Sequence, residues 1–378
     1  MNPVAADMRR LMLSSEKIRG SLRRLLPAPF MKRSRKNVSR VFAAGLVVAA
    51  AHSITALAQV GNNFPFGRNF SSVVSPEMAA LGSRGVHVHD PSTIVKCKDN
   101  YWVFYTGRGI PSYHSKDLVK WEPGPHVFTN APAWANQAVP EHRGNYFWAP
   151  DVIHLGNRYL LYYSVSTFGK KISAIGLATN PTLDPDDPAF HWTDQGEVIR
   201  STSTNDFNTI DPAVSQDAGG KLWLSFGSYW SGIKLVQLDP KTGKRLALDS
   251  KIYSLAHSDS IEASYIYHRG VYYYLFVNWG KCCSGINSTY NIRVGRSKQI
   301  TGPYLDHSGA DMLQGGGTLL LGSEKQFIGP GHAGIISANG ADWFSCHFYD
   351  GSRGGFSTLA ILPLRWTAND WPEIIRAK

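Results

Sequence analysis

Three acidic residues lie in short, recurring motifs and could carry acid–base chemistry. Asp90 and Asp211 each precede a proline, and Glu262 begins the related sequence Glu262-Ala263-Ser264. A single Asp-Pro is usually part of a turn, but three carboxylates at matched places in a repeat are harder to explain in that way. Crowded carboxylates raise one another's pKa, so one can stay protonated while another is ionised. One acid and one base facing each other across a cleft are the groups that hydrolyse a glycosidic bond.

The elements that must position these carboxylates are themselves repeated. Five β-prone, aromatic runs each follow a shorter apolar strand that opens on one of the motifs. The runs are residues 101–105, 159–163, 222–226, 272–276 and 343–347. Aligned on the residue before each proline, the repeats start at 90, 149, 211, 262 and 329, with spacings of 59, 62, 51 and 67 residues. Each unit is long enough for four strands, and no amphipathic helices separate the units. The pattern therefore predicts an all-β, five-bladed β-propeller over residues 85–378, rather than a β-sandwich with coincidental spacing.

In a propeller, the innermost strands run side by side around the axis, so equivalent positions of different blades become neighbours. The alignment puts Ala263 in the place of the proline in the fourth unit. Its five equivalent positions are Asp90, Ala149, Asp211, Glu262 and Gly329. We therefore expect three carboxylates and two small residues around one pocket. Asp151 lies two residues further along its strand and is interpreted as structural.

Two tryptophans are placed to bind a sugar ring. Trp148 directly precedes the second motif position, and Trp230 lies just beyond a core strand, in the run 227–230. An indole face at such a place can stack on the C–H surface of a sugar. Ser228, from the same run, is a further candidate for binding substrate.

The positive charge of the chain is concentrated at its N-terminus. The chain has 39 Lys and Arg against 28 Asp and Glu, a net charge of +11, but residues 1–58 hold 11 of the basic and 2 of the acidic residues. The remaining residues carry only +2. Such a body has no broad electrostatic attraction for a polyphosphate backbone, so we expect no nucleic-acid partner.

The N-terminal segment has the pattern of a secretory signal. A basic run precedes the apolar stretch 41–51, and Ala56-Leu57-Ala58 fits a signal-peptidase site. We expect residues 1–58 to be a signal peptide with a long basic segment and residues 59–84 to be a short lead-in. Met31 is an alternative start of translation, because the basic residues that follow it would form an ordinary basic segment by themselves. The apolar run is too short for a spanning helix, so the processed protein is expected to be extracellular or periplasmic and not bound to a membrane.

The four cysteines do not form a disulfide scaffold or a C-x-x-C metal pair. Cys282 and Cys283 are adjacent and could form a disulfide only in a strained ring, so two thiols in a loop are the favoured interpretation. Whether Cys97 and Cys346 approach each other between the first and last blades is left open.

The motifs together resemble those of the endo-α-1,5-L-arabinanases of glycoside hydrolase family 43, over about residues 85–350. The motifs that carry the resemblance are His89-Asp90-Pro91-Ser92, Trp148-Ala149-Pro150-Asp151-Val152, Ile210-Asp211-Pro212, Ile261-Glu262-Ala263 and Gly329-Pro330-Gly331-His332. The run KCCSGINSTY at 281–290 is more specific to the arabinanase branch. The chain has Ser264 where a proline is usual and Ala333 where Asn or Ser often follows the histidine, which puts details of substrate binding in question.

The resemblance implies a propeller that hydrolyses arabinan by a single displacement with inversion. It implies that Asp90 is the general base, Glu262 the general acid, and Asp211 the residue that orients Glu262 and tunes its pKa. It also implies that Trp148 borders the sugar at the cleavage point. Finally, His332 would hold a hydrated metal ion, usually calcium, near the axis.

Two other functions remain open at this point. One is an exo-acting α-L-arabinofuranosidase or β-xylosidase of the same superfamily. The other is a carbohydrate-binding propeller without catalysis, although a binding protein has no need of a mutually repelling acidic cluster. In each case the expected partner is a polysaccharide such as the arabinan of pectin, and the protein is expected to be a monomer.

Overall fold

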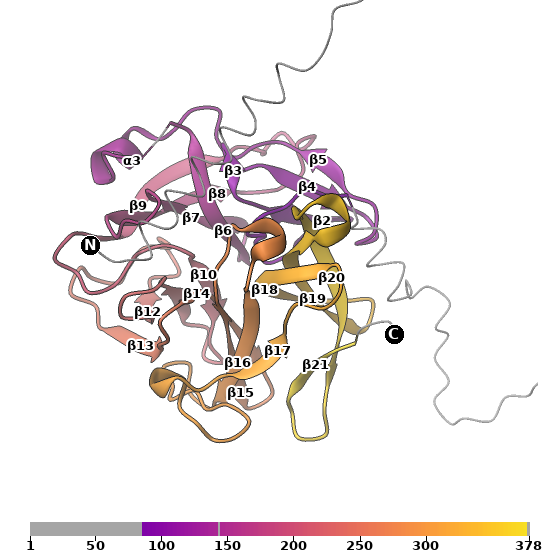
Figure 1. Ribbon diagram of the computed structural model, residues 1–378. Helices are drawn as coiled ribbons and strands as arrows, with labels where there is room; N and C mark the ends of the chain where they lie inside the picture. The colour runs from indigo at the N-terminus through magenta and orange to yellow at the C-terminus, as the bar shows by residue number, and fades with distance from the viewer. Residues whose placement is uncertain (1–84, 143, 376–378) are drawn as a thin grey trace, which may run out of the picture. The chain divides into compact units, whose positions relative to one another are not determined.

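Five antiparallel sheets, formed by successive stretches of the chain, surround a common axis (Figure 1). The computed structural model describes residues 85–142 and 144–375. The expected signal peptide and lead-in, residues 1–84, lie outside the described residues. The arrangement confirms the predicted all-β, five-bladed β-propeller.

Each sheet is a blade whose main strands follow one another in sequence order. Blade one contains β1 (Val95–Cys97), β2 (Asn100–Phe104), β4 (Ser112–Ser115) and β5 (Glu122–Gly124). Blade two contains β6 (Tyr146–Leu155), β7 (Arg158–Val165), β8 (Ser173–Asn180) and β9 (Thr193–Ser201), with β3 (Gly107–Arg108) added beside β6. Blade three contains β10 (Ala213–Gln216), β11 (Leu222–Phe226), β12 (Ile233–Leu238) and β13 (Ile252–Ala256).

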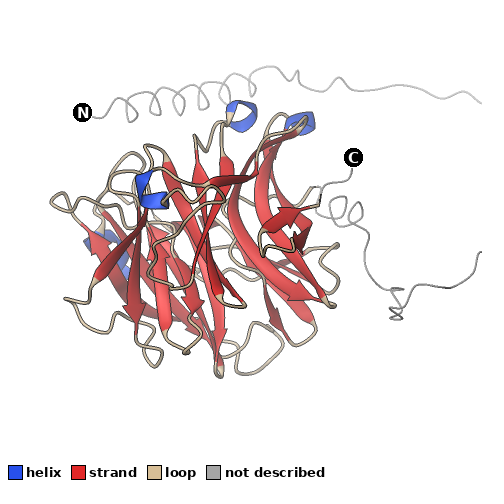
Figure 2. Cartoon of the chain, turned by 90° about the horizontal axis from the view of Figure 1, so that it is seen from below, coloured by secondary structure: helices blue, strands red, loops and turns tan. Residues whose placement is uncertain are grey.

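Blade four contains β14 (Ile261–Arg269), β15 (Tyr272–Trp279), β16 (Asn291–Ser297) and β17 (Thr318–Leu321). Blade five contains β18 (Phe327–Ala338), β19 (Ala341–Asp350), β20 (Phe356–Trp366) and β21 (Pro372–Ile374). The described helical segments are short and lie in the connections: α3 (Ala133–Ala138), η1 (Gly285–Asn287), η2 (Met312–Gln314) and η3 (Gly351–Arg353). Figure 2 shows the strands running between loops that gather at their two ends. Among the described residues, no helix has the length and apolar character needed to cross a membrane.

The hydrophobic core consists of five clusters, and each is shared by two neighbouring blades. In the cluster between blades four and five, for example, the rings of Phe276 and Phe344 lie 5.9 Å apart. Neighbouring blades cover both faces of β8 and β11, so every residue of these two strands is buried. This is why apolar residues do not alternate with exposed polar ones along these strands.

The ring is closed by contacts between the start and the end of the propeller. His87 forms a β-bridge with Thr358 of blade five, and the N–H of Leu359 donates to the carbonyl of Val86 (3.1 Å). The cluster between blades one and five then packs Val103 with Trp343. Closure therefore brings residues more than 200 positions apart in sequence to the same side of the axis.

A residue with a left-handed backbone near the start of each blade marks the positions that are equivalent around the axis. These residues are Asp90 (φ 52°), Ala149 (φ 40°), Asp211 (φ 57°), Ala263 (φ 52°) and His332 (φ 57°). The ladder shifts register at the bulges of blades two, four and five. Such bulges re-aim side chains, often beside active sites.

These bulges correct the sequence alignment in two blades. Ala263, not Glu262, is equivalent to Asp90 and Asp211, so the alignment was wrong by one residue in blade four. In blade five both Gly329 (φ 55°) and His332 (φ 57°) have a left-handed backbone, but it is His332 that lines the central recess together with Ala149, Asp211 and Ala263. The error arose because the alignment relied on proline, whereas the left-handed backbone that defines the bulge requires no proline at the following residue.

The cysteines lie in three separate places. Cys97 belongs to the core cluster between blades one and two, whereas Cys346 belongs to the cluster between blades four and five. The two residues therefore do not meet between the first and last blades. Cys282 and Cys283 lie in the connection from β15 to β16, and no disulfide joins them.

Candidate active site

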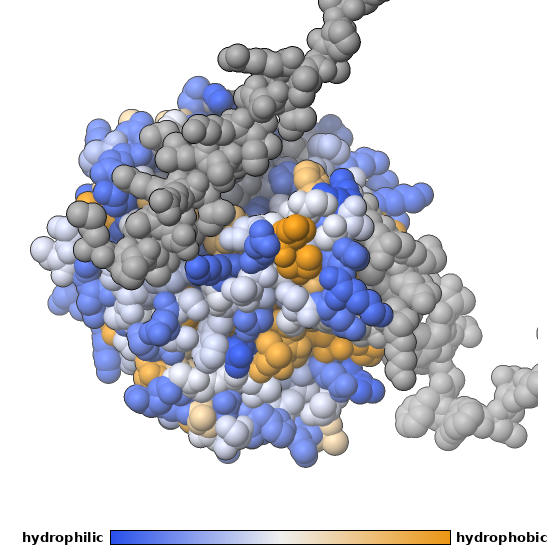
Figure 3. Space-filling model, viewed as in Figure 1, coloured by the Kyte–Doolittle hydropathy of each residue, from blue (hydrophilic) through white to orange (hydrophobic). Residues whose placement is uncertain are grey.

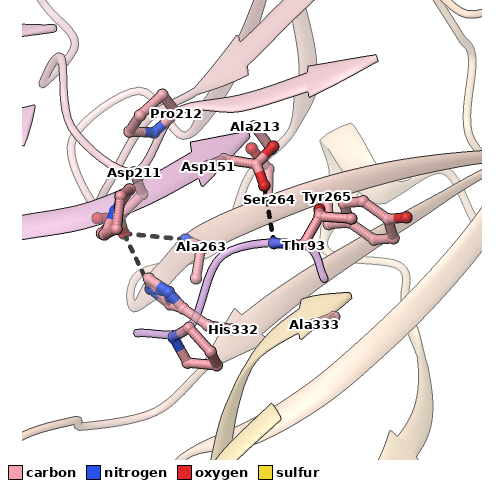
Figure 4. A pocket seen from close by; sticks show the side chains of 13 residues that line it. Thr93, Asp151, Asp211, Pro212, Ala213, Ala263, Ser264, Tyr265, His332 and Ala333 are labelled. Carbon is pink, nitrogen blue, oxygen red and sulfur yellow. Dashed lines mark hydrogen bonds and ion pairs between the residues drawn. The ribbon is translucent and has the colours of Figure 1, made fainter. Parts of the chain in front are cut away.

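The inner ends of the five blades surround a recess of about 300 Å³ near the propeller axis (Figure 4). Its lining includes one or more residues from every blade, among them Thr93, Asp151, Asp211, Ser264 and His332. The left-handed residues Ala149, Asp211, Ala263 and His332 line the recess, whereas Asp90 and Glu262 lie next to lining residues in the sequence. The first strand of each blade thus positions the candidate catalytic residues.

Asp90 is held as a carboxylate by groups from blades one and five. The Thr106 hydroxyl donates to its Oδ2 (2.6 Å), and its Oδ1 lies 2.8 Å from Nδ1 of His89 and 3.4 Å from Nε2 of His332. Its backbone N–H donates to Nδ1 of His347 (3.1 Å). Burial alone would raise the pKa of Asp90, but His89 and His332 lower it well below its usual range. Asp90 is therefore ionised at neutral pH and available as a base.

The His89 ring connects Asp90 to blade five. Burial opposes protonation of His89, but the Asp90 carboxylate outweighs it and raises the pKa of His89 well above its ordinary value. A protonated His89 donates from Nδ1 to Asp90 and from Nε2 to the Tyr349 hydroxyl (2.8 Å). The ring also stacks on His347 at 4.3 Å. This network fixes the orientation of the Asp90 carboxylate.

Glu262 is buried, with 7% of its surface exposed, and both of its carboxyl oxygens accept hydrogen bonds. The Ser228 hydroxyl donates to Oε2 (2.7 Å), and the Tyr290 hydroxyl donates to Oε1. Burial raises the pKa of Glu262 to about 7, although these two hydrogen bonds act in the opposite direction. A carboxyl with this pKa can hold a proton near neutral pH and deliver it.

Asp211 contacts the backbone beside Glu262 and the ring of His332. Its Oδ2 accepts the backbone N–H of Ala263 (3.1 Å), the residue directly after Glu262, and lies 4.0 Å from Nε2 of His332. Burial raises its pKa well above the ordinary value, and the negative charges of Glu262 and Asp90 add to this effect. The structure thus brings together all three predicted carboxylates and perturbs Asp90 and Glu262 in opposite directions.

The sugar-binding candidates occupy different places. Trp148 is half-buried at the start of β6 and packs edge-on against Phe168 at 6.3 Å, while Trp230 is 37% exposed in the loop after β11. Ser228 is buried and its hydroxyl faces Glu262. Either tryptophan can offer a ring face to a sugar, whereas the observed contact of Ser228 is with a carboxyl group of the protein.

Asp151 connects three blades through backbone hydrogen bonds. Its carboxylate accepts the N–H of Thr93 from blade one (2.9 Å) and the N–H of Val214 from blade three (2.8 Å). Both bonds satisfy buried backbone donors at the ends of inner strands. These contacts agree with the structural interpretation made from the sequence.

The surroundings of His332 fit a hydrated divalent cation. Burial lowers the pKa of His332, so the neutral ring can offer a nitrogen lone pair, and two carboxylates, Asp90 and Asp211, face the same Nε2. Calcium prefers oxygen ligands, so water would supply most of its coordination. Donor atoms of His89, Asp90 and His347 also lie within 4.8 Å of one another, but they are already engaged in the hydrogen bonds described above.

Sequence reasoning assigned no role to several residues that hold the carboxylates: His89, Thr106, Tyr290, His347 and Tyr349. His89 and Tyr290 lie within motifs that carried the family resemblance, so these motifs were a usable signal. His347 and Tyr349 belong to β19, a strand that was predicted only as core. They reach Asp90 because blade five closes onto blade one.

A pair of carboxyl groups, one ionised and one that can hold a proton, is the equipment that glycoside hydrolases use. A family model described as Glycosyl hydrolases family 43 matches residues 85–372. The chain is therefore a glycoside hydrolase and belongs to family 43, as its motifs predicted.

Several known proteins are similar to this chain over most of its length. It is 42% identical to the extracellular exo-α-(1→5)-L-arabinofuranosidase ArbA of Cellvibrio japonicus, over 78% of this chain and 88% of that protein. It is 41% identical to the extracellular endo-α-(1→5)-L-arabinanase 1 of Bacillus subtilis, over 81% of this chain and 94% of that protein. Among solved structures, the α-L-arabinanase of Cellvibrio cellulosa complexed with arabinohexaose aligns with a TM-score of 0.73 and 40% identity, covering 76% of this chain and 95% of that one.

Proposed function

We propose that the protein hydrolyses internal α-1,5-L-arabinofuranosidic bonds of arabinan by a single displacement with inversion. The observation that carries the proposal is the opposite perturbation of two carboxyl groups within one site. Hydrogen bonds and the protonated His89 keep Asp90 ionised, whereas burial favours the protonated form of Glu262 near neutral pH. The protein thus has a base and an acid ready at the same pH.

Each carboxylate has a distinct part in the proposed reaction. Asp90 accepts a proton from a water molecule as that water attacks the anomeric carbon. Glu262 donates its proton to the oxygen of the leaving sugar. Asp211 keeps the backbone beside Glu262 in place through the Ala263 N–H, and its own pKa is raised by the nearby Glu262, so the two carboxyl groups interact. An inverting enzyme leaves space for the attacking water by separating base and acid by roughly 6.5–9.5 Å.

The names of the relatives support arabinan as the substrate. One solved relative was crystallised with arabinohexaose, and the two curated relatives carry α-(1→5)-arabinan activities in their names. Trp148 and Trp230 would then stack on the sugar rings. The more exposed Trp230 suits a chain that continues beyond the cleaved bond, which favours endo action.

Exo action is the second candidate, because the relative at 42% identity is named an exo-arabinofuranosidase. Digestion of linear, debranched arabinan with early product sizing tests both proposals. A spread of oligosaccharides supports endo action, whereas release of a single short product from chain ends supports exo action. Binding of arabinan without release of reducing ends would show that the propeller only binds carbohydrate.

We also propose that His332 holds a hydrated calcium ion beside Asp90 and Asp211. Bound there, the ion would supply positive charge that offsets the two carboxylates. The residues of the chain would still carry out both proton transfers. Metal analysis of the purified protein, with His332→Ala as the comparison, tests this assignment.

Finally, we propose that the protein is exported and acts on polysaccharide as a monomer. The basic and apolar pattern of residues 1–58 supports export, and two relatives are named extracellular. N-terminal sequencing of the exported protein should begin at Gln59, and sedimentation should give the mass of one chain. An intact N-terminus or a dimer mass would contradict the respective proposal.

A further inference from the structure

Two adjacent thiols lie beside the hydrogen-bond network of the candidate base. In the loop between β15 and β16, Cys282 is partly buried and Cys283 is exposed, and neither is in a disulfide. The backbone N–H of Cys283 donates to the Tyr349 hydroxyl (2.7 Å). The same hydroxyl accepts from His89, which in turn binds Asp90. The loop that carries the thiols is thus connected to the proposed base, Asp90, through Tyr349 and His89.

The two thiols are chemically different. The hydrogen bond from Cys282 lowers the pKa of Cys283 to about 6, and His89 acts in the same direction although the surrounding protein opposes ionisation. The pKa of Cys282 is instead raised by its bond to Cys283 and by burial. The pair therefore combines an exposed nucleophilic thiolate with a protonated neighbour, the environment typical of reactive cysteines.

Cys283 also interacts electrostatically with the acid side of the site. A charge on Cys283 raises the pKa of Glu262 and of Asp211, and likewise those of Tyr146 and Tyr229. The titratable groups that interact with it are His89, Asp90, Tyr146, Asp211, Tyr229, Glu262, Cys282 and Tyr349. A group attached to this sulfur would thus lie near both the proposed base and the proposed acid. Figure 3 shows one face of the molecule, on which a few hydrophobic groups lie among mostly hydrophilic ones.

We propose that Cys283 is a modification site for low-molecular-weight disulfides and that its modification blocks the active site. The Cys283 thiolate attacks one sulfur of R–S–S–R, the S–S bond breaks, and a Cys283–S–S–R bond forms. The leaving R–S⁻ takes up a proton from water. Displacement of R–S⁻ by Cys282 would close a small ring between adjacent residues, which is strained, so the mixed disulfide persists.

The proposed inhibition by Cys283 modification rests on the proposed function, because the modified residue lies beside the same active site. The added group occupies space beside His89 and Tyr349, and it displaces the loop whose backbone N–H binds the Tyr349 hydroxyl. Substrate would then be excluded from the proposed base. A reductant that restores the thiol restores the site.

The test treats the reduced full-length chain with oxidised glutathione and maps the adducts by peptide mass spectrometry. We expect one glutathione on Cys283 and none on the buried Cys97. Hydrolysis of arabinan and calorimetric binding of arabinohexaose should fall in proportion to the modified fraction and recover with dithiothreitol. Each sample is compared with its own untreated aliquot.

Two variants separate the attacking thiol from its neighbour. Cys283→Ser should keep its untreated activity after exposure to glutathione disulfide. Cys282→Ser, whose hydroxyl can still donate to Cys283, should be modified and inhibited as the wild type is.

Several results would overturn the inference. They are an unmodified Cys283, a modified Cys283 with full hydrolysis and full binding, equal labelling of Cys97, or a disulfide between Cys282 and Cys283 as the end product. Failure of the proposed function looks different: the untreated protein would neither hydrolyse arabinan nor bind arabinohexaose, whatever the labelling of Cys283.

Discussion

The hydroxyl of Tyr290 should set the alkaline limit of activity through its hydrogen bond to Glu262. The bond is stronger when the carboxyl is ionised, so it favours ionisation and lowers the pKa of Glu262, which burial has raised to about 7. A hydrogen bond to a charged group contributes about 1.5–3 kcal/mol. Since one pKa unit corresponds to about 1.4 kcal/mol, Tyr290→Phe should raise the pKa of Glu262 by roughly 1–2 units.

The sign of the effect on activity follows from the role of Glu262 as an acid. Activity falls as pH rises through the pKa of Glu262, so Tyr290→Phe should move the alkaline limb of the kcat/KM profile upward by roughly 1–2 pH units. The acidic limb, which depends on Asp90, should stay in place. The assay is the initial rate of reducing-end release from linear arabinan across the pH range.

A matched control removes a buried tyrosine hydroxyl elsewhere. Tyr304 is fully buried in the core between blades three and four, and its hydroxyl donates to the carbonyl of Ile300 (2.9 Å). Tyr304→Phe should therefore leave both limbs unchanged. An alkaline limb that stays in place in Tyr290→Phe, or moves to lower pH, would refute the assignment of Glu262 as the acid held by Tyr290.

Three further predictions concern the other residues of the site. Asp90→Asn and Glu262→Gln should each lower kcat by about 10²–10⁴ while circular dichroism and the melting temperature are retained, and near-normal turnover of either would contradict its role. Asp151→Ala leaves two buried N–H groups without their acceptor, so urea unfolding should show a loss of roughly 2–6 kcal/mol, and a loss below about 1 kcal/mol would argue against the structural role. Calcium at about 100 times its Kd should stabilise the wild type by about 2.7 kcal/mol and His332→Ala much less, whereas equal melting shifts in both proteins would place the ion elsewhere.

Local sequence was sufficient to predict the blades. Each blade needs only β-prone residues, a turn every few residues and a repeated order, and all three are properties of neighbouring positions. The aromatic run of β11, Leu222–Phe226, was predicted as a core strand and is buried throughout. The three carboxylates could also be identified, because Asp90 and Asp211 occupy equivalent positions of the repeat and Glu262 lies one residue before that position in its blade.

The alignment was less accurate where the bulge lacks its usual proline. Ala263 and His332 have the left-handed backbone of Asp90 and Asp211, yet no proline follows either residue. Backbone conformation at these positions is imposed by the neighbouring blades and by hydrogen bonds such as the one from the His332 N–H to the side chain of Asn278 (3.0 Å). A search based on residue types therefore missed the equivalence by one position in blade four and three in blade five.

By itself, the sequence determined the repeat, the blades and the identity of the three carboxylates. Only the tertiary structure decided which of them is ionised, because that depends on partners distant in sequence. Asp90 is 257 residues from His347, and Glu262 receives its hydrogen bonds from Ser228 in the preceding blade and from Tyr290 beyond the next strand. Burial and closure of the ring fix the pKa of each carboxyl, and no local pattern encodes either of them.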